Sequence, residues 1–86
     1  MAFDYNEFKQ LKNNNKFEAF NYAYNNYLFG DVNACYELAQ IYYKGLENTI
    51  PKNLESAFQF FLEAANKNDY RAQNMVGIFY ECGYYV

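Results

Sequence analysis

Few side chains in this sequence could carry out covalent chemistry. The chain has no histidine and Ser56 is its only serine, so a Ser-His-Asp site is impossible. Ser56 is followed by Ala57-Phe58-Gln59, which lacks the lysine of a Ser-x-x-Lys hydrolase. No glycine-rich phosphate loop is present either. We therefore expect a protein that is not an enzyme.

The cysteines and carboxylates give the same expectation. Cys35 and Cys82 are too few for a metal cluster in a chain without histidine. Glu55 and Glu63 stand two helical turns apart, a spacing typical of solvated charge on an outer helix face. We expect small core or surface residues at both cysteines, and neither a metal nor a cofactor.

Composition limits the remaining classes. The 86 residues carry a net charge of −3, and 23% of them are aromatic. The sequence contains no run of lysine and arginine of the kind that would indicate nucleic-acid binding. No stretch approaches the ~20 apolar residues of a membrane helix, and the first residues do not resemble a secretory signal. The sequence thus favours a soluble, cytoplasmic domain whose many rings pack helix on helix.

An internal repeat positions these residues. At an offset of 38, residues 34–45 lie over residues 72–83, and apolar, small and glycine positions coincide. The offset also holds upstream, where Ala19 aligns with Ala57 and Asp31 with Asp69. With Ala34 over Ala72, Leu38 aligns with Val76, Ala39 with Gly77, Ile41 with Phe79, Tyr42 with Tyr80, and Gly45 with Gly83.

The local pattern is helical. Apolar residues recur at i, i+4, i+7 and i+8 from Ala34, and again from Leu54 to Ala65. Asn53 is placed as an N-cap, and Gly45 ends the helix before it. Phe8 and Leu11 indicate a short helix that the asparagines at 13–15 break, and 16–29 forms another. The sequence predicts five helices joined by short loops.

These residues resemble a known family. The run Ala34-x-x-x-Leu38-Ala39-x-Ile41-Tyr42-x-x-Gly45 is similar to the first helix of a Sel-1-like repeat, a tetratricopeptide-related unit. Residues 50–65 resemble its second half, and 72–83 begins a second copy. The resemblance implies an all-α fold, an α-α superhelix that forms a short right-handed solenoid of antiparallel hairpins. The expected single domain, 1–86, divides into an N-terminal hairpin (3–33), a full repeat (34–71) and a truncated repeat (72–86).

Small residues should let the helix axes approach, while large neighbours fill the grooves beside them. The expected packing positions of the full repeat are Ala34, Leu38, Ala39, Ile41, Tyr42, Gly45, Ala57, Phe58, Phe61 and Ala64. Those of the truncated repeat are Ala72, Val76, Gly77, Phe79, Tyr80 and Gly83. Since 72–86 lacks a second helix, we expect Val76, Phe79 and Tyr80 to be exposed. Such a patch fits either a longer solenoid or an end-to-end homodimer.

The same resemblance implies a binding surface. First helices of such repeats line a concave face, and tyrosine and arginine are common at binding hot spots. Helical periodicity independently places Tyr36, Gln40 and Tyr43 on one side, although Tyr36 and Tyr43 could instead only pack. The expected inward-facing residues are Asn33, Tyr36, Gln40, Tyr43, Lys44, Arg71, Asn74, Ile78 and Glu81.

The family also bears on the cysteines. Secreted members bridge a cysteine pair eight positions apart, but Tyr27 stands where Cys35 would need its partner. Gln73, the repeat equivalent of Cys35, precedes Cys82 by nine residues, which span ~13 Å of helix. That span exceeds the ~7 Å limit between bridged Cα atoms. We therefore expect no disulfide between Cys35 and Cys82, and two free thiols.

The resemblance implies a non-catalytic scaffold or adaptor that binds a protein or peptide on its concave face. Two alternatives stay open. One is a penicillin-interacting or β-lactamase-like member of the secreted repeat family, and the other is a self-assembling structural module.

Overall fold

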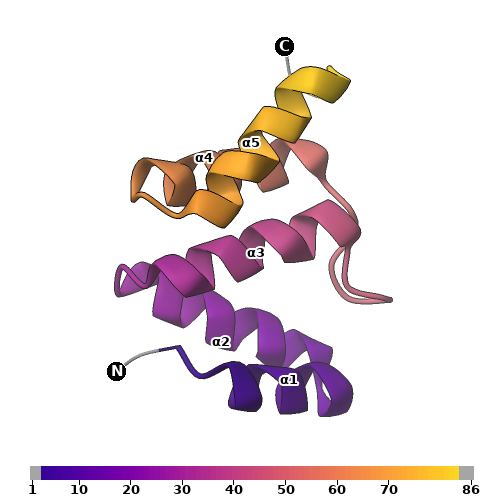
Figure 1. Cartoon of the computed structure of the whole chain (residues 1–86). Helices are drawn as coiled ribbons and strands as arrows, with labels where there is room; N and C mark the ends of the chain where they lie inside the picture. The colour runs from indigo at the N-terminus through magenta and orange to yellow at the C-terminus, as the bar shows by residue number, and fades with distance from the viewer. Residues whose placement is uncertain (1–2, 84–86) are drawn as a thin grey trace.

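A computed structural model of the chain describes residues 3–83 and contains five helices in that range. They are α1 (Tyr5–Asn14), α2 (Lys16–Leu28), α3 (Val32–Lys44), α4 (Leu54–Asn66) and α5 (Tyr70–Cys82). Consecutive helices pack against one another, as Figure 1 shows. The predicted all-α helical-repeat fold is confirmed. Residues 84–86 of the expected truncated repeat, and residues 1–2, lie outside the described range.

The helices begin where the sequence supplies capping side chains. Asp4, Asp31 and Asp69 precede α1, α3 and α5, and each accepts hydrogen bonds from the backbone N–H groups two and three positions on. Asn15 and Asn53 precede α2 and α4, and each accepts from the N–H three positions on. These bonds satisfy donors that the first helical turn leaves unpaired. The first helix of each hairpin thus has an aspartate cap, and the second helix has an asparagine cap.

The turns after α2 and α4 share one backbone geometry. Gly30 and Asn68, which are 38 residues apart, have positive φ angles of 90° and 70°. In both turns the N–H of the capping aspartate donates to the carbonyl five residues earlier, at 3.2 Å. Equivalent local chemistry therefore gives equivalent turns, as the repeat predicts.

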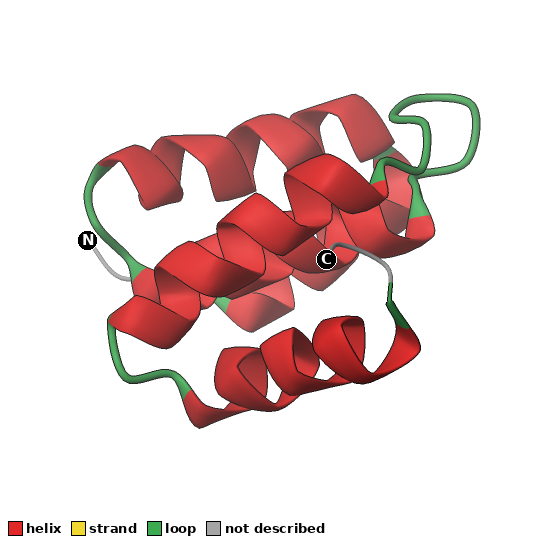
Figure 2. Cartoon of the chain, turned by 90° about the horizontal axis from the view of Figure 1, so that it is seen from above, coloured by secondary structure: helices red, strands yellow, loops and turns green. Residues whose placement is uncertain are grey.

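The loop from α3 to α4 is longer than the other connections and projects from one end of the helices (Figure 2). It begins at Gly45, whose φ is 79°. A Cβ built there would lie 3.1 Å from the backbone nitrogen of Lys52. Leu46 and Ile50 form an isolated antiparallel bridge that closes the loop. Glycine is needed here both for the positive φ and for the close approach.

Two hydrophobic clusters lie on the two sides of α3. The first joins it to α1 and α2 and includes Leu38 and Ile41, together with Ala19 and Ala23 of α2. The second joins it to α4 and α5, and its buried members are Cys35, Ala39, Ala57, Phe58, Phe61, Ala64, Ala72 and Phe79. Alanines fully buried in both clusters allow close helix contact, as expected.

The full repeat buries most of its expected packing residues. Ala34, Leu38, Ala39, Ile41, Ala57, Phe58, Phe61 and Ala64 are all buried. Tyr42 is half-buried, and its ring stacks on that of Phe60 with the centroids 5.6 Å apart.

The last helix requires two corrections. Phe79, expected to be exposed, is fully buried because it packs on Phe58 and Phe61 at centroid distances of 5.6 and 5.8 Å. Gly77, expected to pack like Ala39, is exposed, and a Cβ built on it would meet nothing within 4 Å. The reason is that α4 covers Ala39, whereas no helix of residues 3–83 follows α5 to cover Gly77.

The other positions on α5 vary in exposure. Ala72 is buried and Val76 is half-buried. Tyr80 is about half exposed, yet its ring makes an edge contact with Phe58 that matches the contact of Tyr42 with Phe20. Gly83 has the left-handed φ of 69° and caps the helix. The uncovered patch of α5 is therefore smaller than expected.

Candidate functional site

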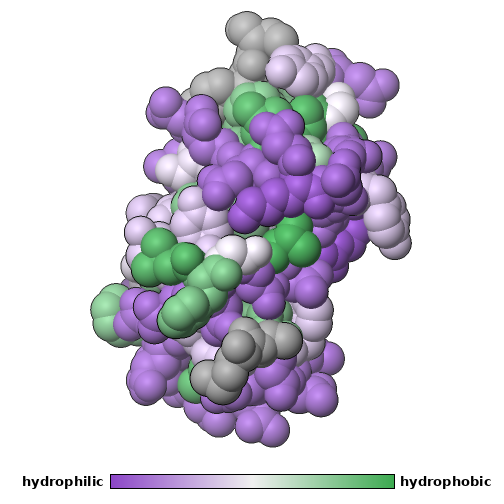
Figure 3. All heavy atoms as spheres, turned by 90° about the vertical axis from the view of Figure 1, so that its left-hand side faces the viewer, coloured by the Kyte–Doolittle hydropathy of each residue, from purple (hydrophilic) through white to green (hydrophobic). Residues whose placement is uncertain are grey.

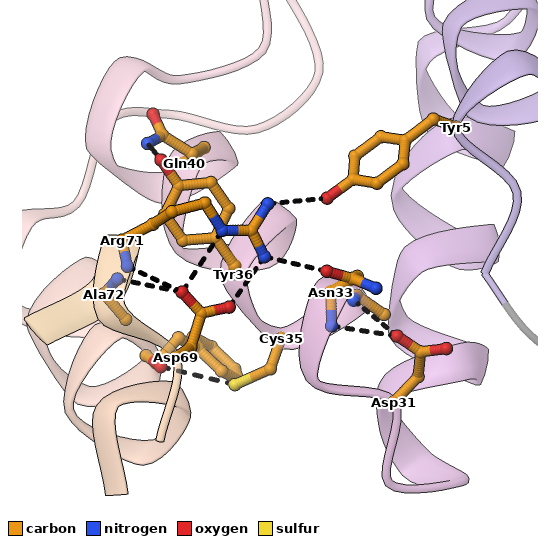
Figure 4. A network of polar contacts seen from close by, with 11 residues as sticks. Tyr5, Asp31, Asn33, Cys35, Tyr36, Gln40, Asp69, Arg71 and Ala72 are labelled. Atoms are coloured by element: carbon orange, nitrogen blue, oxygen red, sulfur yellow. Dashed lines mark hydrogen bonds and ion pairs between the residues drawn. The ribbon is translucent and has the colours of Figure 1, made fainter. Parts of the chain in front are cut away.

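A polar network centred on Arg71 joins three helices (Figure 4). Its Nη2 contacts Asp69 Oδ2 at 2.6 Å and donates to Asn33 Oδ1 at 2.8 Å. Its Nη1 donates to Tyr5 Oη at 3.0 Å. The guanidinium carbon also lies 4.2 Å from the centroid of the Tyr36 ring, which is a cation–π contact. Residues from the starts of α1, α3 and α5 thus meet at one cation.

The sequence explains why Arg71 points into this network. Asp69 must precede α5 as its cap, and its carboxylate accepts from the Arg71 side chain as well as from the Arg71 and Ala72 N–H groups. Its bond with Arg71 holds the pKa of Asp69 below its usual value, despite an opposing effect of burial. Conversely, the carboxylate raises the pKa of Arg71. The cap therefore orients the arginine.

Tyr36 is fixed by further contacts on α3. Its hydroxyl accepts from Gln40 Nε2 at 2.7 Å, and its ring lies 5.7 Å from that of Phe61. Since Arg71 contacts the ring as well, Tyr36 is ordered on several sides and remains half-buried. An ordered amphipathic ring of this kind can bind a ligand at low cost in side-chain entropy.

Two surface hollows meet at Tyr36. The first has a volume of about 300 Å³ and is lined by Lys12, Tyr36, Glu37, Gln40, Ile41, Lys44, Gly45 and Leu46. The second, about 680 Å³, is lined by Tyr36, Tyr70, Arg71, Gln73, Asn74 and Met75. A third hollow, about 410 Å³, belongs to the α3–α4 loop. The first two extend along the face shared by α1, α3 and α5, which we call the odd-helix face.

The first hollow contains an unusual carboxylate. Burial raises the pKa of Glu37, while the positive charges of Lys12, Arg71 and Lys44 lower it. None of these three cations forms an ion pair with Glu37 among the described residues. A mixed-charge hollow of this kind suits a polar or charged peptide group.

The structure places the expected binding residues in four groups. Asn33, Tyr36, Gln40 and Arg71 belong to the network, and Lys44 and Asn74 line the hollows. Tyr43 packs between Phe61 and Phe79, at 6.2 and 5.8 Å, which is the packing role left open by the sequence. Ile78 is half-buried and Glu81 exposed, and neither lines these two hollows.

Sequence reasoning missed Tyr5, Lys12 and Glu37. The first two lie on α1, which the sequence gives only as a short amphipathic helix. The contact between Tyr5 and Arg71 could not be predicted, because 66 residues separate the two in the sequence. Glu37 could have been found, since it follows Tyr36 directly and precedes Gln40 by less than one turn.

The cysteines differ in their surroundings. Cys35 is buried, and its Sγ donates to the Phe60 carbonyl at 3.3 Å. Burial raises the pKa of the Cys35 thiol to about 11, so it is protonated at neutral pH and a poor nucleophile. Cys82 is exposed, and both thiols are free. Within residues 3–83, no cluster of three or more histidine, cysteine or acidic side chains could bind a metal ion.

The fold is that of an all-α helical-repeat protein. Protein-family comparison matches the Sel1 repeat to residues 32–69 and 71–86, more than half of the chain. The chain belongs to the Sel1 repeat family, whose repeats generally serve as protein-interaction modules. No curated protein and no solved structure gives a significant match. Among the described residues, no helix has the length and apolar character to span a bilayer.

Proposed function

We propose that the chain is a non-catalytic scaffold that binds a peptide or loop of another protein along its odd-helix face. One observation carries this proposal. Four residues expected at the binding face, Asn33, Tyr36, Gln40 and Arg71, meet in one ordered network, and Tyr36 lines two hollows.

The chemistry of the face supports a protein ligand. Arginine and tyrosine are enriched at binding hot spots, and here Arg71 and Tyr36 are only half-buried. Lys12, Glu37, Lys44 and Asn74 supply both charges and an amide around them. A segment with polar side chains and at least one acidic group would complement the two lysines.

The hydrolase alternative has no such support. Ser56 lies in the first turn of α4, where its N–H donates to the cap Asn53 at 3.0 Å. The chain offers no histidine as a base. We expect no turnover of the chromogenic β-lactam nitrocefin by the purified chain, and measurable turnover would refute the non-catalytic proposal.

The test of the binding face uses exposed residues that do not hold the fold. We expect the double variant Lys44→Glu/Asn74→Ala to lose proteins that the tagged wild-type chain captures from its source cells. Binding to each captured protein should weaken at least tenfold by titration calorimetry. Circular dichroism should remain unchanged, because both side chains are exposed.

The matched control lies on another helix. Gln59 is exposed on the outer face of α4, so Gln59→Ala should capture the same proteins as wild type. If the double variant also captured them with unchanged affinity, the odd-helix face would not be the binding site.

A further inference from the structure

The outer face of α2 is apolar although it faces solvent. Phe17, Tyr24 and Leu28 are 61%, 40% and 63% exposed. With Asn21 they form one stripe at helical spacing, on the side of α2 opposite its fully buried Ala19 and Ala23. Amphipathic surface helices normally present polar residues there.

The repeat provides an internal control for this stripe. At the offset of 38, the outer face of α4 carries Glu55, Gln59, Leu62 and Asn66 in place of Phe17, Asn21, Tyr24 and Leu28. Three of these four positions are polar or charged in α4, which has the same capping geometry. The fold therefore does not require an apolar outer face, and its presence on α2 needs another explanation.

The adjoining turns differ in the same way. Phe29 follows the α2 stripe and is 88% exposed, whereas Lys67 occupies the equivalent position after α4. Figure 3 looks onto the end of the molecule with both turns. Hydrophobic side chains gather at the level of the α2–α3 turn, and hydrophilic ones cover the level of the α4–α5 turn.

The stripe has the size of a small interface. From the exposed fractions of Phe17, Tyr24 and Leu28, and with the adjoining Phe29 included, it offers roughly 500 Å² of surface. Two such surfaces together would bury at most roughly 1,000 Å², which is the area that a specific protein contact should reach. A contact of this area fits weak, reversible association.

The spacing of the stripe indicates which surface would cover it. The steps from 17 to 21, 24 and 28 are four, three and four residues, a pattern that reads the same in both directions. A two-fold related copy in antiparallel orientation would therefore set Phe17 against Leu28, and Asn21 against Tyr24. Apolar groups then meet apolar groups, and the amide meets the hydroxyl. These steps are those of the a and d positions in an antiparallel coiled coil.

We propose that the chain forms a homodimer through the outer face of α2, with the two α2 helices antiparallel. The stripe contains no charged residue that two copies would have to bring together. Its central ring is already ordered, because Tyr24 stacks on Phe20 at 6.1 Å and contacts Tyr27 at 5.9 Å. This order reduces the entropy lost on association. The odd-helix face stays free, so dimerisation would give a scaffold with two binding faces.

Sedimentation velocity on the full chain, from about 1 µM to about 1 mM, measures the association. We expect a monomer–dimer equilibrium in this range. The variant Phe17→Glu/Leu28→Asn, which gives α2 the residues of α4, should weaken dimerisation at least tenfold. Leu62→Glu, on the outer face of α4, is the matched control and should dimerise like wild type.

Two outcomes would overturn the proposal. One is a wild-type chain that stays monomeric throughout the range, even if it then binds lipid vesicles or another protein. The other is a double variant that dimerises like wild type, which would place the contact elsewhere, for example on the uncovered side of α5. All substituted side chains are exposed or half-buried in the monomer, so circular dichroism should confirm folding.

A charge pair tests the antiparallel register. In Phe17→Lys/Leu28→Glu, the proposed dimer brings opposite charges together at both ends, whereas Phe17→Lys/Leu28→Lys brings like charges together. The first variant should therefore dimerise at least tenfold more tightly than the second at low salt, and the difference should shrink as salt is added. Equal dimerisation of the two variants would refute the antiparallel arrangement.

Discussion

Helices α2 and α4 are 38 residues apart and share their backbone but not their side-chain surfaces. Both begin at a capping asparagine, contain 13 residues and end in a turn with a positive φ angle. Ala19 and Ala57 are equivalent and fully buried. On the outer side, however, Phe17 stands in place of Glu55. Caps and small buried residues are thus repeated because they make the hairpin, while the exposed residues of the two helices differ.

The inner sides of the two helices differ as well. Phe61 of α4 occupies the position that Ala23 has in α2. Its ring lies within about 6 Å of the rings of Tyr36, Tyr43 and Phe79, so it joins α3 to α5. Because Tyr36 also contacts Arg71, the buried Phe61 packs directly beneath a ring of the odd-helix face and helps to fix its position.

The substitution Phe61→Ala, which gives α4 the inner residue of α2, should cause the largest loss of stability among the variants compared. A fully buried phenylalanine leaves a cavity when it is removed, and we expect the free energy of unfolding to fall by about 3–5 kcal/mol. Urea denaturation followed by circular dichroism measures the loss.

Phe17→Ala makes the same chemical change on the outer side of α2, where the ring is mostly exposed. We expect it to change the stability of the monomer by less than about 0.5 kcal/mol. Equal losses in the two variants would contradict the inner and outer assignments of these helices.

The caps of α3 and α5 allow a second comparison. Asp31 accepts from two N–H groups of its own helix and from the Phe3 N–H at 2.9 Å. Asp69 accepts from two N–H groups and also pairs with Arg71. We therefore expect Asp69→Ala to cost about 2–3 kcal/mol and Asp31→Ala about 1–2 kcal/mol. Urea titrations at pH 7 compare the two.

The effect of Asp69 should depend on pH in a defined direction. Its hydrogen bond with Arg71 lowers the pKa of Asp69 in the folded chain, so folding favours the ionised form. The resulting stability is fully present above the unfolded pKa of about 3.9 and is lost as the pH falls through the lower folded value. The gap between wild type and Asp69→Ala should narrow below about pH 4. A gap that widened in acid would contradict the assignment.

These comparisons separate what sequence alone could predict from what it could not. The five helices were predictable because their caps, such as Asn53, and their apolar periods are local signals. Tyr36 and Gln40 were placed on one face for the same reason, since helical spacing fixes their relative direction. Arg71 followed from its position in the repeat.

The misses concern contacts between distant segments. Tyr5 and Arg71 are 66 residues apart in the sequence, and no local pattern records that α1 and α5 approach each other there. Phe79 was expected on an open face, but it turns toward Phe58 and Phe61 in α4. Tyr43 serves packing for the same reason, since the ring of Phe79 lies 5.8 Å away. Periodicity gives the side of a helix, and the neighbouring helix decides whether that side is covered.

Ala39 and Gly77 provide the smallest and most discriminating comparison. Ala39 is fully buried, whereas Gly77 is exposed and a Cβ built on it would meet nothing within 4 Å. Gly77→Ala should therefore stabilise the chain by about 0.5–1 kcal/mol, because alanine restricts the unfolded chain and favours the helix. Ala39→Gly should destabilise it by about 1–2 kcal/mol, since both the buried methyl and the helix propensity are lost.

Thermal melts of both variants, read by circular dichroism, decide whether the exposed side of α5 is free in solution. If it is, the melting temperature rises for Gly77→Ala and falls for Ala39→Gly. A fall for Gly77→Ala as well would show that a neighbour packs closely on α5. Repeating the melts at several protein concentrations would identify the neighbour. If the neighbour is a second copy of the chain, the decrease in melting temperature grows with concentration. If it is a segment of the same chain, the decrease is independent of concentration.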